Sequence, residues 1–472
     1  METAVQRTEP PAPQHVPWTP QLVRVMAGLM ASLFLAAIDA TVVGTAGPTI
    51  ARDLGHFELY PWIFTAYLLV GTTTVPLWGR VADLFGRRWV LLVGIGMFVV
   101  ASPLCMTSRS MVTLIAFRAL QGVGAGCIQP VVFTVVGDIF PVRQRARLQG
   151  FFSSMWAISA VLGPAVGALL VSTLGWQWIF GINLPIGVLA MALLWGYRER
   201  RGTRDTGGLD FRGAALLTAA IVLLLLGAGA GSTHAQPNLA LLAVGLVLLA
   251  GFVWLELRNP NPTVPLDLLR HRVLGPALVV VTLGGALMFG VTAYVPIYVQ
   301  NVLGGSPYQA GAAVGLMSLG WPAGSIISGF TLVRVGYARL LVLGTGALLG
   351  GAVVLVLGAA SGVLWLAAAC ALIGLGMGFF SSPTLIVIQS SVEWGRRGAA
   401  TALNQFCRTI GSSVGVALMG VLLQAALTAG PTRGALQHGL SAVFWVQLGL
   451  AAATMLTALV ILRMREPVLA TT

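Results

Sequence analysis

The sequence contains no lysine. All 27 basic residues are arginine, and with 14 acidic residues they give a net charge of +13. A phosphate-binding P-loop needs a lysine that reaches the phosphates of the nucleotide, so ATP hydrolysis by that motif is excluded. The arginine bias is typical of GC-rich coding and favours a bacterial source.

Charge of either sign is also scarce. Charged residues make up 9% of the 472 residues, hydrophobic residues make up 57%, and the mean hydropathy is +0.88. A soluble protein of this length needs far more polar surface. Apolar runs of 18 or more residues recur along the chain without strand-like alternation. They predict an all-α polytopic membrane protein and exclude a β-barrel.

Cysteine and histidine are too few and too scattered to predict a metal or catalytic centre. The cysteines lie in apolar runs without metal-ligand spacing, and the histidines fall in loops or at the ends of apolar runs. These residues are Cys105, Cys127, Cys370 and Cys407, and His15, His56, His234, His271 and His438. We therefore expect neither a membrane enzyme nor a bound cofactor. A channel is disfavoured because no ring of charges or filter-like loop is present.

Fourteen apolar segments are long enough to cross a bilayer. They cover residues 21–47, 58–79, 88–107, 110–137, 146–173, 176–196, 211–231, 238–257, 273–302, 307–332, 338–358, 362–389, 397–427 and 437–463. With the N-terminus inside, 22 arginines fall in cytoplasmic segments or at the cytoplasmic ends of the spans, and only Arg52, Arg109 and Arg433 fall in outer loops. This asymmetry predicts that both termini are cytoplasmic. It also explains the positive charge by topology rather than by nucleic-acid binding.

The two halves of the chain repeat each other at an offset of about 250 residues. The matched pairs are Gly79 and Gly329, Gly86 and Gly336, Gly122 and Gly374, Gly124 and Gly376, Gly126 and Gly378, and Gly163 and Gly415, with Arg143 and Arg145 beside Arg396 and Arg397. A parallel repeat predicts two bundles with a substrate site between them. We expect a cytoplasmic tail (1–20), a six-helix bundle (21–196), a linker with two extra spans (197–271), a second six-helix bundle (272–463) and a final tail (464–472).

Five motifs occur in order on these predicted helices. They are IDATVVGTAGP at 38–48, GRVADLFGRR at 79–88, LIAFRALQG at 114–122, SAVLGPAVGA at 159–168 and WQWIFGINLPIG at 176–187. Together they resemble the major facilitator superfamily and, more narrowly, its fourteen-helix drug:proton antiporter branch. The sequence departs from the usual residues of these motifs at Gly44, Gly47, Leu84, Ser159 and Ala168.

The resemblance implies an exporter of hydrophobic or cationic small molecules that is driven by the proton gradient through alternating access. It implies a multi-pass protein of the bacterial inner membrane, which we expect to be monomeric. Export of a lipid or lipid-like metabolite on the same fold is the alternative. Neither a long outer extension nor an extra acidic residue in the fifth helix points to lipid handling.

Asp39 is the only acidic residue well inside a predicted span. Burying such a charge costs roughly 2.5–3.5 kcal/mol on insertion scales, so a functional role is the default interpretation of Asp39. Counted at about 1.5 Å per residue, Asp39 and Arg118 lie at similar depths in their helices. We expect Asp39 to bind and release the transported proton during the cycle, as its separation from Arg118 changes. A permanent structural ion pair is the alternative.

Arg408 is the only charged residue away from the ends of the spans of the second half. It has three open roles: closing on Asp39, binding an anionic group, or pairing structurally. Polar and aromatic residues at suitable depths are candidates to line the substrate cleft. These candidates are Trp62, Tyr67, Gln129, Tyr294, Tyr298, Asn404 and Gln405.

Two further sets of residues have expected mechanical roles. A cytoplasmic gate is predicted from the second motif and the inner end of the fourth span; the alternative is a solvated basic turn. Its members are Gly79, Asp83, Gly86, Arg87, Arg88 and Asp138. Asp83 is also placed to cap the thirteenth span. Gly163, Pro164 and Gly167, in the motif associated with antiporters, are expected to bend the fifth span and let it approach a neighbour.

Overall fold

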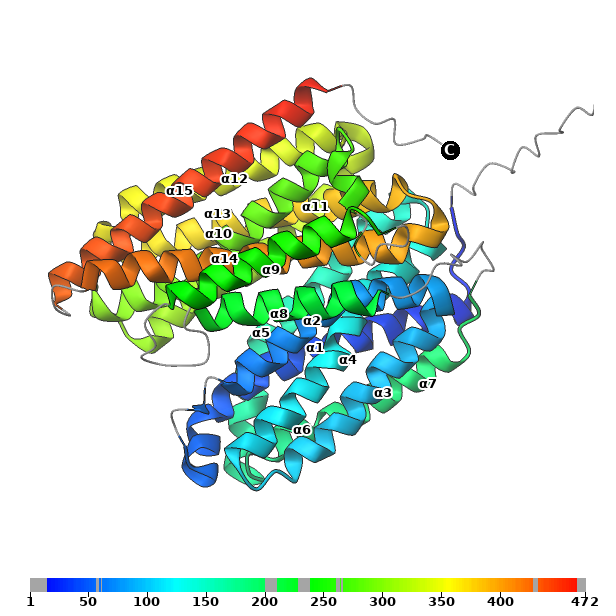
Figure 1. The fold of residues 1–472 in the computed structure, drawn as a ribbon, viewed down its shortest axis with the longest axis horizontal. Coiled ribbons are helices and arrows are strands. Elements are labelled where there is room, and N and C mark those ends of the chain that lie inside the picture. The colour runs from blue at the N-terminus through cyan, green and yellow to red at the C-terminus, as the bar shows by residue number, and fades with distance from the viewer. Residues whose placement is uncertain are drawn as a thin grey trace, which may run out of the picture.

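The computed structural model describes residues 15–56, 59–60, 62–199, 210–227, 238–259, 264, 266–427 and 432–464. Within these ranges the regular structure is helical and no strand occurs. Figure 1 shows one bundle formed by the first half of the chain and another formed by the second half. The expected all-α architecture is therefore confirmed.

The first bundle contains α1 (Pro20–Leu54), α2 (Trp62–Phe85), α3 (Arg87–Met106), α4 (Met111–Ile139), α5 (Val142–Thr173), α6 (Trp178–Gly181) and α7 (Asn183–Trp195). Next come α8 (Phe211–Gly227) and α9 (Leu239–Glu256). The second bundle contains α10 (Leu274–Asn301), α11 (Pro307–Val335), α12 (Tyr337–Gly358), α13 (Val363–Ser390), α14 (Arg397–Leu427) and α15 (Arg433–Arg463). Capping boxes begin two of these helices: Ser110 with Thr113 at α4, and Ser306 with Gln309 at α11.

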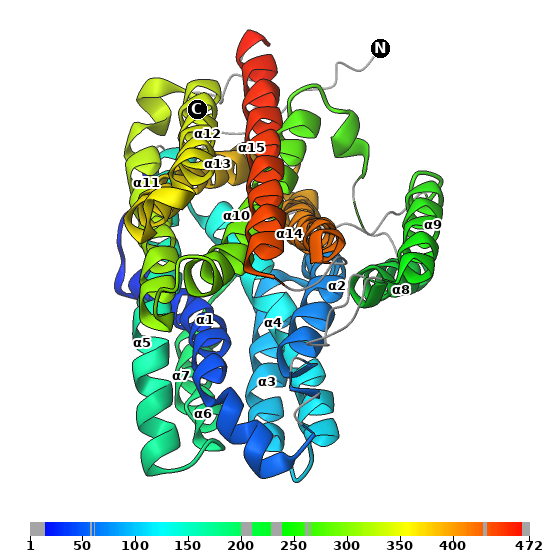
Figure 2. The ribbon, with the colours of Figure 1, turned by 90° about the vertical axis from the view of Figure 1, so that its left-hand side faces the viewer.

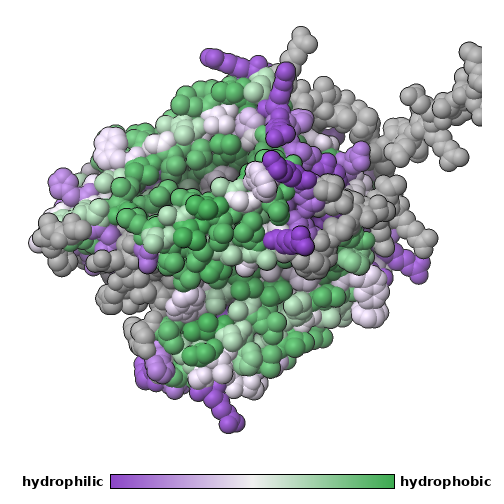
Figure 3. Space-filling view, in the orientation of Figure 1, coloured by the Kyte–Doolittle hydropathy of each residue, from purple (hydrophilic) through white to green (hydrophobic). Residues whose placement is uncertain are grey.

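Twelve helical segments in the described ranges are long and apolar enough to cross a membrane, counting α6 and α7 as one. Two predicted spans fall outside this set. In α8 the apolar stretch is only Ala215–Leu224, and α2 contains three successive threonines together with Arg80 and Asp83. The prediction of fourteen spans is therefore not confirmed. Apolar side chains cover the flanks of the helices, and hydrophilic ones gather near their ends (Figure 3).

Glycines bring the helices within each bundle into backbone contact. A Cβ at Gly124 in α4 would lie 2.6 Å from the carbonyl oxygen of Gly94 in α3. A Cβ at Gly376 in α13 would lie 2.5 Å from the carbonyl oxygen of Gly344 in α12. Since Gly124 and Gly376 are matched in the repeat, the same close helix packing is built once in each half.

The halves meet through two further matched contacts. A Cβ at Gly79 in α2 would lie 2.7 Å from the carbonyl oxygen of Gly398 in α14. A Cβ at Gly329 in α11 would lie 2.1 Å from the carbonyl oxygen of Ala146 in α5. The pair α8 and α9 stands outside both bundles, beside α2 and α14 (Figure 2).

Candidate functional site

A cavity of about 390 Å³ lies between the two halves. Helices α1, α2, α4 and α5 of the first half line it together with α10, α11, α13 and α14 of the second. This volume falls within the usual range for small-molecule sites. Of the predicted cleft residues, Tyr67, Gln129, Asn404 and Gln405 line the cavity, and so does Arg408.

The other three predicted cleft residues lie elsewhere. Tyr294 and Tyr298 are buried in the apolar core of the second half. The hydroxyl of Tyr294 donates to the carbonyl of Val416 at 2.8 Å, and the ring of Tyr298 packs on Phe444. Trp62 begins α2 and is not part of the lining. Depth along a helix is visible in the sequence, but the direction of each side chain depends on how the helices pack.

Asp39 lies outside the cavity lining, fully buried between α1, α4 and α7. Arg118 Nη1 donates to its Oδ2 at 2.7 Å. Gln121 Nε2 and Asn183 Nδ2 donate to Oδ1 at 3.1 Å and 2.8 Å. Both amide groups also reach the hydroxyl of Ser102. Helices α4 and α7 thus supply three donors to one carboxylate of α1, and Ser102 of α3 contacts two of these donors.

Tyr67 connects this network to the cavity. Tyr67 is part of the cavity lining, and the guanidinium of Arg118 lies 4.1 Å from the centroid of its ring. The Nε of Arg118 donates to the carbonyl of Ile63, one turn earlier in α2. A molecule that displaces Tyr67 therefore perturbs the surroundings of the Asp39–Arg118 pair directly.

The network includes three residues that the sequence did not single out: Ser102, Gln121 and Asn183. Gln121 and Asn183 stand inside the quoted motifs at 114–122 and 176–187. Two amide side chains in apolar spans were the available signal, because a buried amide needs partners. The described residues contain no cluster of histidine, cysteine and acidic side chains that could hold a metal ion.

At one end of the molecule, Arg87 and Asp83 join the halves. Arg87 is fully buried and pairs with Asp83 at 2.8 Å, with Asp138 at 3.1 Å and with Glu199 at 3.6 Å. Its guanidinium stacks on Trp394 at 3.7 Å and donates to the carbonyl of that residue. A solvated basic turn does not describe this geometry.

The carboxylate of Asp83 caps α14. The backbone N–H groups of Gly398 and Ala399 donate to it at 2.9 Å and 2.8 Å. This is the helix-end contact expected from the sequence, and it combines hydrogen bonding with the positive end of a helix dipole. Gly79 lies one turn earlier on α2, where α14 approaches, and Gly86 turns the chain into α3 with a positive φ of 98°.

Two arginines fasten the same end in a reciprocal way. Arg397, at the start of α14, donates to the carbonyl of Gly137 at 3.3 Å and to Asp138 at 3.5 Å at the end of α4. Arg145, near the start of α5, donates to Gln389 at 3.2 Å and to Ser390 at 3.1 Å at the end of α13. We call these two contacts the Arg397 clasp and the Arg145 clasp.

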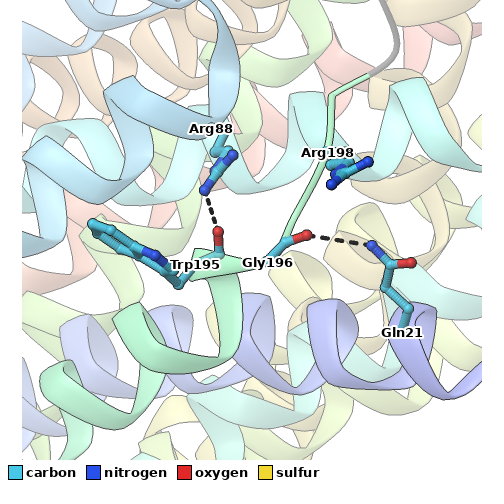
Figure 4. A pocket seen from close by; sticks show the side chains of 5 residues that line it. All are labelled: Gln21, Arg88, Trp195, Gly196 and Arg198. Atoms are coloured by element: carbon cyan, nitrogen blue, oxygen red, sulfur yellow. Dashed lines mark hydrogen bonds between the residues drawn. The ribbon is translucent and has the colours of Figure 1, made fainter.

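Arg88 does not join this cluster. It lines a shallow pocket with Gln21, Trp195, Gly196 and Arg198, where it donates to the carbonyl of Trp195 (Figure 4). Gln21 Nε2 donates to the carbonyl of Gly196 at 3.3 Å. These two hydrogen bonds connect the starts of α1 and α3 to the end of α7.

Tyr197 lies just after α7 and close to the charged residues of the Arg87 cluster. It is buried, and burial together with the carboxylates of Asp138 and Glu199 raises the pKa of its hydroxyl. The hydroxyl is therefore neutral at physiological pH. It packs beside the ion pairs of Arg87 without adding another negative charge.

The predicted bending element of α5 packs on α1. A Cβ at Gly163 would lie 2.1 Å from Oγ1 of Thr41, which itself donates to the carbonyl of Ser159 at 3.0 Å. Gly167 is buried on the same helix, whereas Pro164 is exposed. Helix α5 therefore lies close to α1 at Thr41, which is two residues after Asp39 in the sequence.

Comparison with known proteins agrees with this geometry. A family profile described as Major Facilitator Superfamily matches residues 29–416. The multidrug transporter protein MdtP of Bacillus subtilis (strain 168) is 34% identical over 408 residues, which is 85% of this chain and 75% of that protein. Multidrug resistance protein 3 of the same organism is 30% identical over 403 residues, covering 84% of this chain and 79% of that protein.

Among solved structures, the human organic anion transporter MFSD10 (TETRAN) aligns with a TM-score of 0.69 at 17% identity. The alignment covers 93% of this chain and 100% of that one, and at this identity it shows the shared fold alone. The profile match spans most of the chain, including both halves of the repeat. The chain belongs to the Major Facilitator Superfamily, whose members are membrane transporters rather than enzymes and need no cofactor.

Proposed function

We propose that this chain is a proton-coupled exporter that carries hydrophobic small molecules out of the cell by alternating access. Similarity to a multidrug transporter and a multidrug resistance protein supports drug export. The cavity between the halves supports a substrate site near the middle of the molecule. Coupling to protons is supported by the buried carboxylate beside that cavity.

The observation that carries the proposal is the placement of Asp39. Its carboxylate is fully buried, and its partner Arg118 contacts Tyr67, a residue of the cavity lining. Protonation would remove the charge that Arg118, Gln121 and Asn183 stabilise, and so would weaken the contacts between α1, α4 and α7. Substrate and proton would then act on the same group of residues from opposite sides of Tyr67.

The gradient supplies enough energy for this exchange. One charge moved through 100 mV is worth about 2.3 kcal/mol, which corresponds to roughly fortyfold in concentration. Closure at the Arg87 cluster and opening elsewhere would alternate access. We place that cluster at the cytoplasmic face, since the arginine-rich loops lie there.

We also propose that α2 and α8 cross the membrane, which gives fourteen spans with both termini in the cytoplasm of a bacterium. α2 packs along α4 and α14, so its polar residues face protein rather than lipid. α8 pairs with the apolar helix α9. Labelling of single cysteines by a membrane-impermeant thiol reagent tests this topology at 55 and 238, which should react from outside, and at 85 and 212, which should not.

The test of function is transport in proteoliposomes with an imposed pH gradient. Tritiated 2-naphthoate, 2-naphthamide and 2-naphthylmethylammonium serve as anionic, neutral and cationic probes of similar size. The wild type should accumulate at least one probe, and Asp39→Asn should exchange it without accumulation. Asp267→Asn, which changes an exposed carboxylate paired with Arg396, is the matched control and should accumulate normally.

Two results would contradict the proposal. One is accumulation by the wild type that persists after the pH gradient is collapsed. The other is full accumulation by Asp39→Asn, because a carboxylate that is not needed for coupling cannot be the proton carrier.

A further inference from the structure

The central cavity contains one charged side chain among its described lining residues, and that charge is positive. Arg408 of α14 lines the cavity, and no aspartate or glutamate does. Arg118 and Asp39 form an ion pair outside the lining, so their two charges balance each other. The cavity wall therefore carries a net positive charge.

The backbone of α14 fixes the direction of Arg408. Its carbonyl oxygen lies against α10, where a Cβ at Gly285 would come within 2.3 Å. The side chain reaches across the cavity to α4 and α11 instead. There Nη2 donates to Gln129 Oε1 at 3.4 Å, and the guanidinium lies 5.4 Å from the ring centroid of Trp321.

These partners leave the charge of Arg408 unbalanced. A guanidinium has five N–H donors, and the described contacts are one long hydrogen bond to an amide and one aromatic ring. Among the described residues Arg408 forms no ion pair. The sequence left open whether Arg408 closes on Asp39, but both carboxylate oxygens of Asp39 are already occupied by other donors.

Three kinds of substrate have different consequences for this charge. A purely apolar molecule would displace water from the guanidinium and supply no acceptor, which is costly. A cation would add repulsion inside a site of low dielectric. A carboxylate, phenolate or sulfonate would accept hydrogen bonds from the planar donor fork and balance its charge.

The rest of the lining suits an aromatic body attached to such a group. Tyr67, Phe133, Trp156, Trp321 and Phe380 contribute aromatic faces to the cavity. Asn404 lies one helical turn before Arg408 on the same face of α14, and its Oδ1 is buried without a hydrogen-bond partner. Because Oδ1 only accepts, it is the Nδ2 group of this amide that would donate to the acidic group of a ligand beside Arg408.

We infer that this transporter prefers aromatic organic anions, and that Arg408 recognises their acidic group. The inference rests on the proposed export function for its direction of transport, but not for the binding preference itself. It replaces the cationic class suggested by family resemblance with the opposite charge.

The test is binding of the three naphthalene probes to the purified full-length protein in detergent, by competition against tritiated 2-naphthoate. The wild type should bind 2-naphthoate at least tenfold more tightly than the amide or the ammonium compound. Arg408→Gln should lower naphthoate affinity to the level of the amide and leave amide affinity within about twofold. Arg147→Gln, which changes an exposed arginine stacked on Phe330 outside the cavity, is the matched control and should keep the preference.

Equal binding of the three probes by the wild type would overturn the inference, as would a preference that survives in Arg408→Gln. If that variant is not monodisperse, Arg408→Lys decides: it keeps the charge and should retain at least a threefold preference, and equal binding would overturn the role of the charge. Failure of the proposed function is a separate result. In that case the uptake of naphthoate into proteoliposomes would not depend on the pH gradient, while the binding preference would remain.

Discussion

In the first half of the molecule, α4 presents Arg118 and Gln121 to the carboxylate of Asp39. When Gly122 is aligned with Gly374, the matching residues of α13 are Cys370 and Ile373, which are fully buried in the apolar core of the second half. The glycines around them, by contrast, make equivalent backbone contacts in both halves. Packing positions were therefore kept in both copies of the repeat, whereas among the described residues the buried network of a carboxylate and an arginine exists only in the first copy.

The Arg397 clasp and the Arg145 clasp show the same contrast between symmetric positions and asymmetric chemistry. The same alignment matches Arg145 with Arg397 and Ser390 with Asp138. Both arginines reach across to the opposite half, but only Arg397 meets a carboxylate. The positions are symmetric, whereas the strength and the salt dependence of the two contacts should differ.

The largest effect is expected from breaking the polar network of the first half. Asp39→Ala leaves Arg118 buried without its carboxylate, which should destabilise the fold by about 3–5 kcal/mol. The double variant Asp39→Leu/Arg118→Met removes both charges and should recover part of that loss, although Gln121 and Asn183 still lose an acceptor. Thermal unfolding in detergent measures both.

Cys370→Ala is the control at the matching site of the second half and should cost much less than Asp39→Ala, since no charge is left behind. A double variant as unstable as Asp39→Ala would show that the network contributes to folding in its own right. The two halves would then differ in architecture as well as in chemistry.

A smaller and symmetric effect is expected for the packing glycines. Gly124→Ala and Gly376→Ala each place a methyl group within 2.6 Å of a backbone carbonyl oxygen of the neighbouring helix. Each should destabilise the protein by about 1–3 kcal/mol through overpacking. Gly346→Ala, where no atom lies within 4 Å of the added carbon, should be nearly neutral in the same unfolding assay. A large difference between the first two variants would mean that the halves do not share one frame.

The smallest effect is expected at the clasps. Arg397→Gln and Arg145→Gln should each shift the equilibrium towards opening of the Arg87 end by about fivefold or less, since such contacts are worth about 1 kcal/mol. Spin labels at positions 85 and 333, both exposed at the ends of α2 and α11, measure the separation in a background without native cysteines. Raising the salt concentration should open Arg145→Gln as much as the wild type and Arg397→Gln less. Equal salt responses of the two variants would remove the proposed distinction between the clasps.

The sequence predicted the helical class, the repeat and the approach of Asp39 to Arg118, because hydropathy, matched glycines and depth along a helix are all readable along one dimension. The capping of α14 by Asp83 was also expected, since a carboxylate near a helix start has an obvious physical partner. The prediction failed to separate α2 and α8 from the more apolar spans.

What the sequence did not supply is the direction of side chains around each helix. Tyr294 and Tyr298 have the right depth for the cleft but point into the second bundle, and Asn183 joins Asp39 from a helix 144 positions further along the chain. Arg88 follows Arg87 directly, yet one turns towards α7 and the other into the ion pairs. These outcomes depend on tertiary packing that periodicity in a uniformly apolar helix does not encode.

The described residues of the inserted pair α8 and α9 are not part of the cavity lining. Helix α8 nevertheless packs on α2 and also touches α14, the two helices that meet across the halves at Gly79 and Gly398. Any rearrangement that separates α2 from α14 must therefore break or slide one of these contacts. If the halves separate at α2 and α14, as the proposed alternating access requires, the hairpin would have to slide on one of these helices and would limit how far they open.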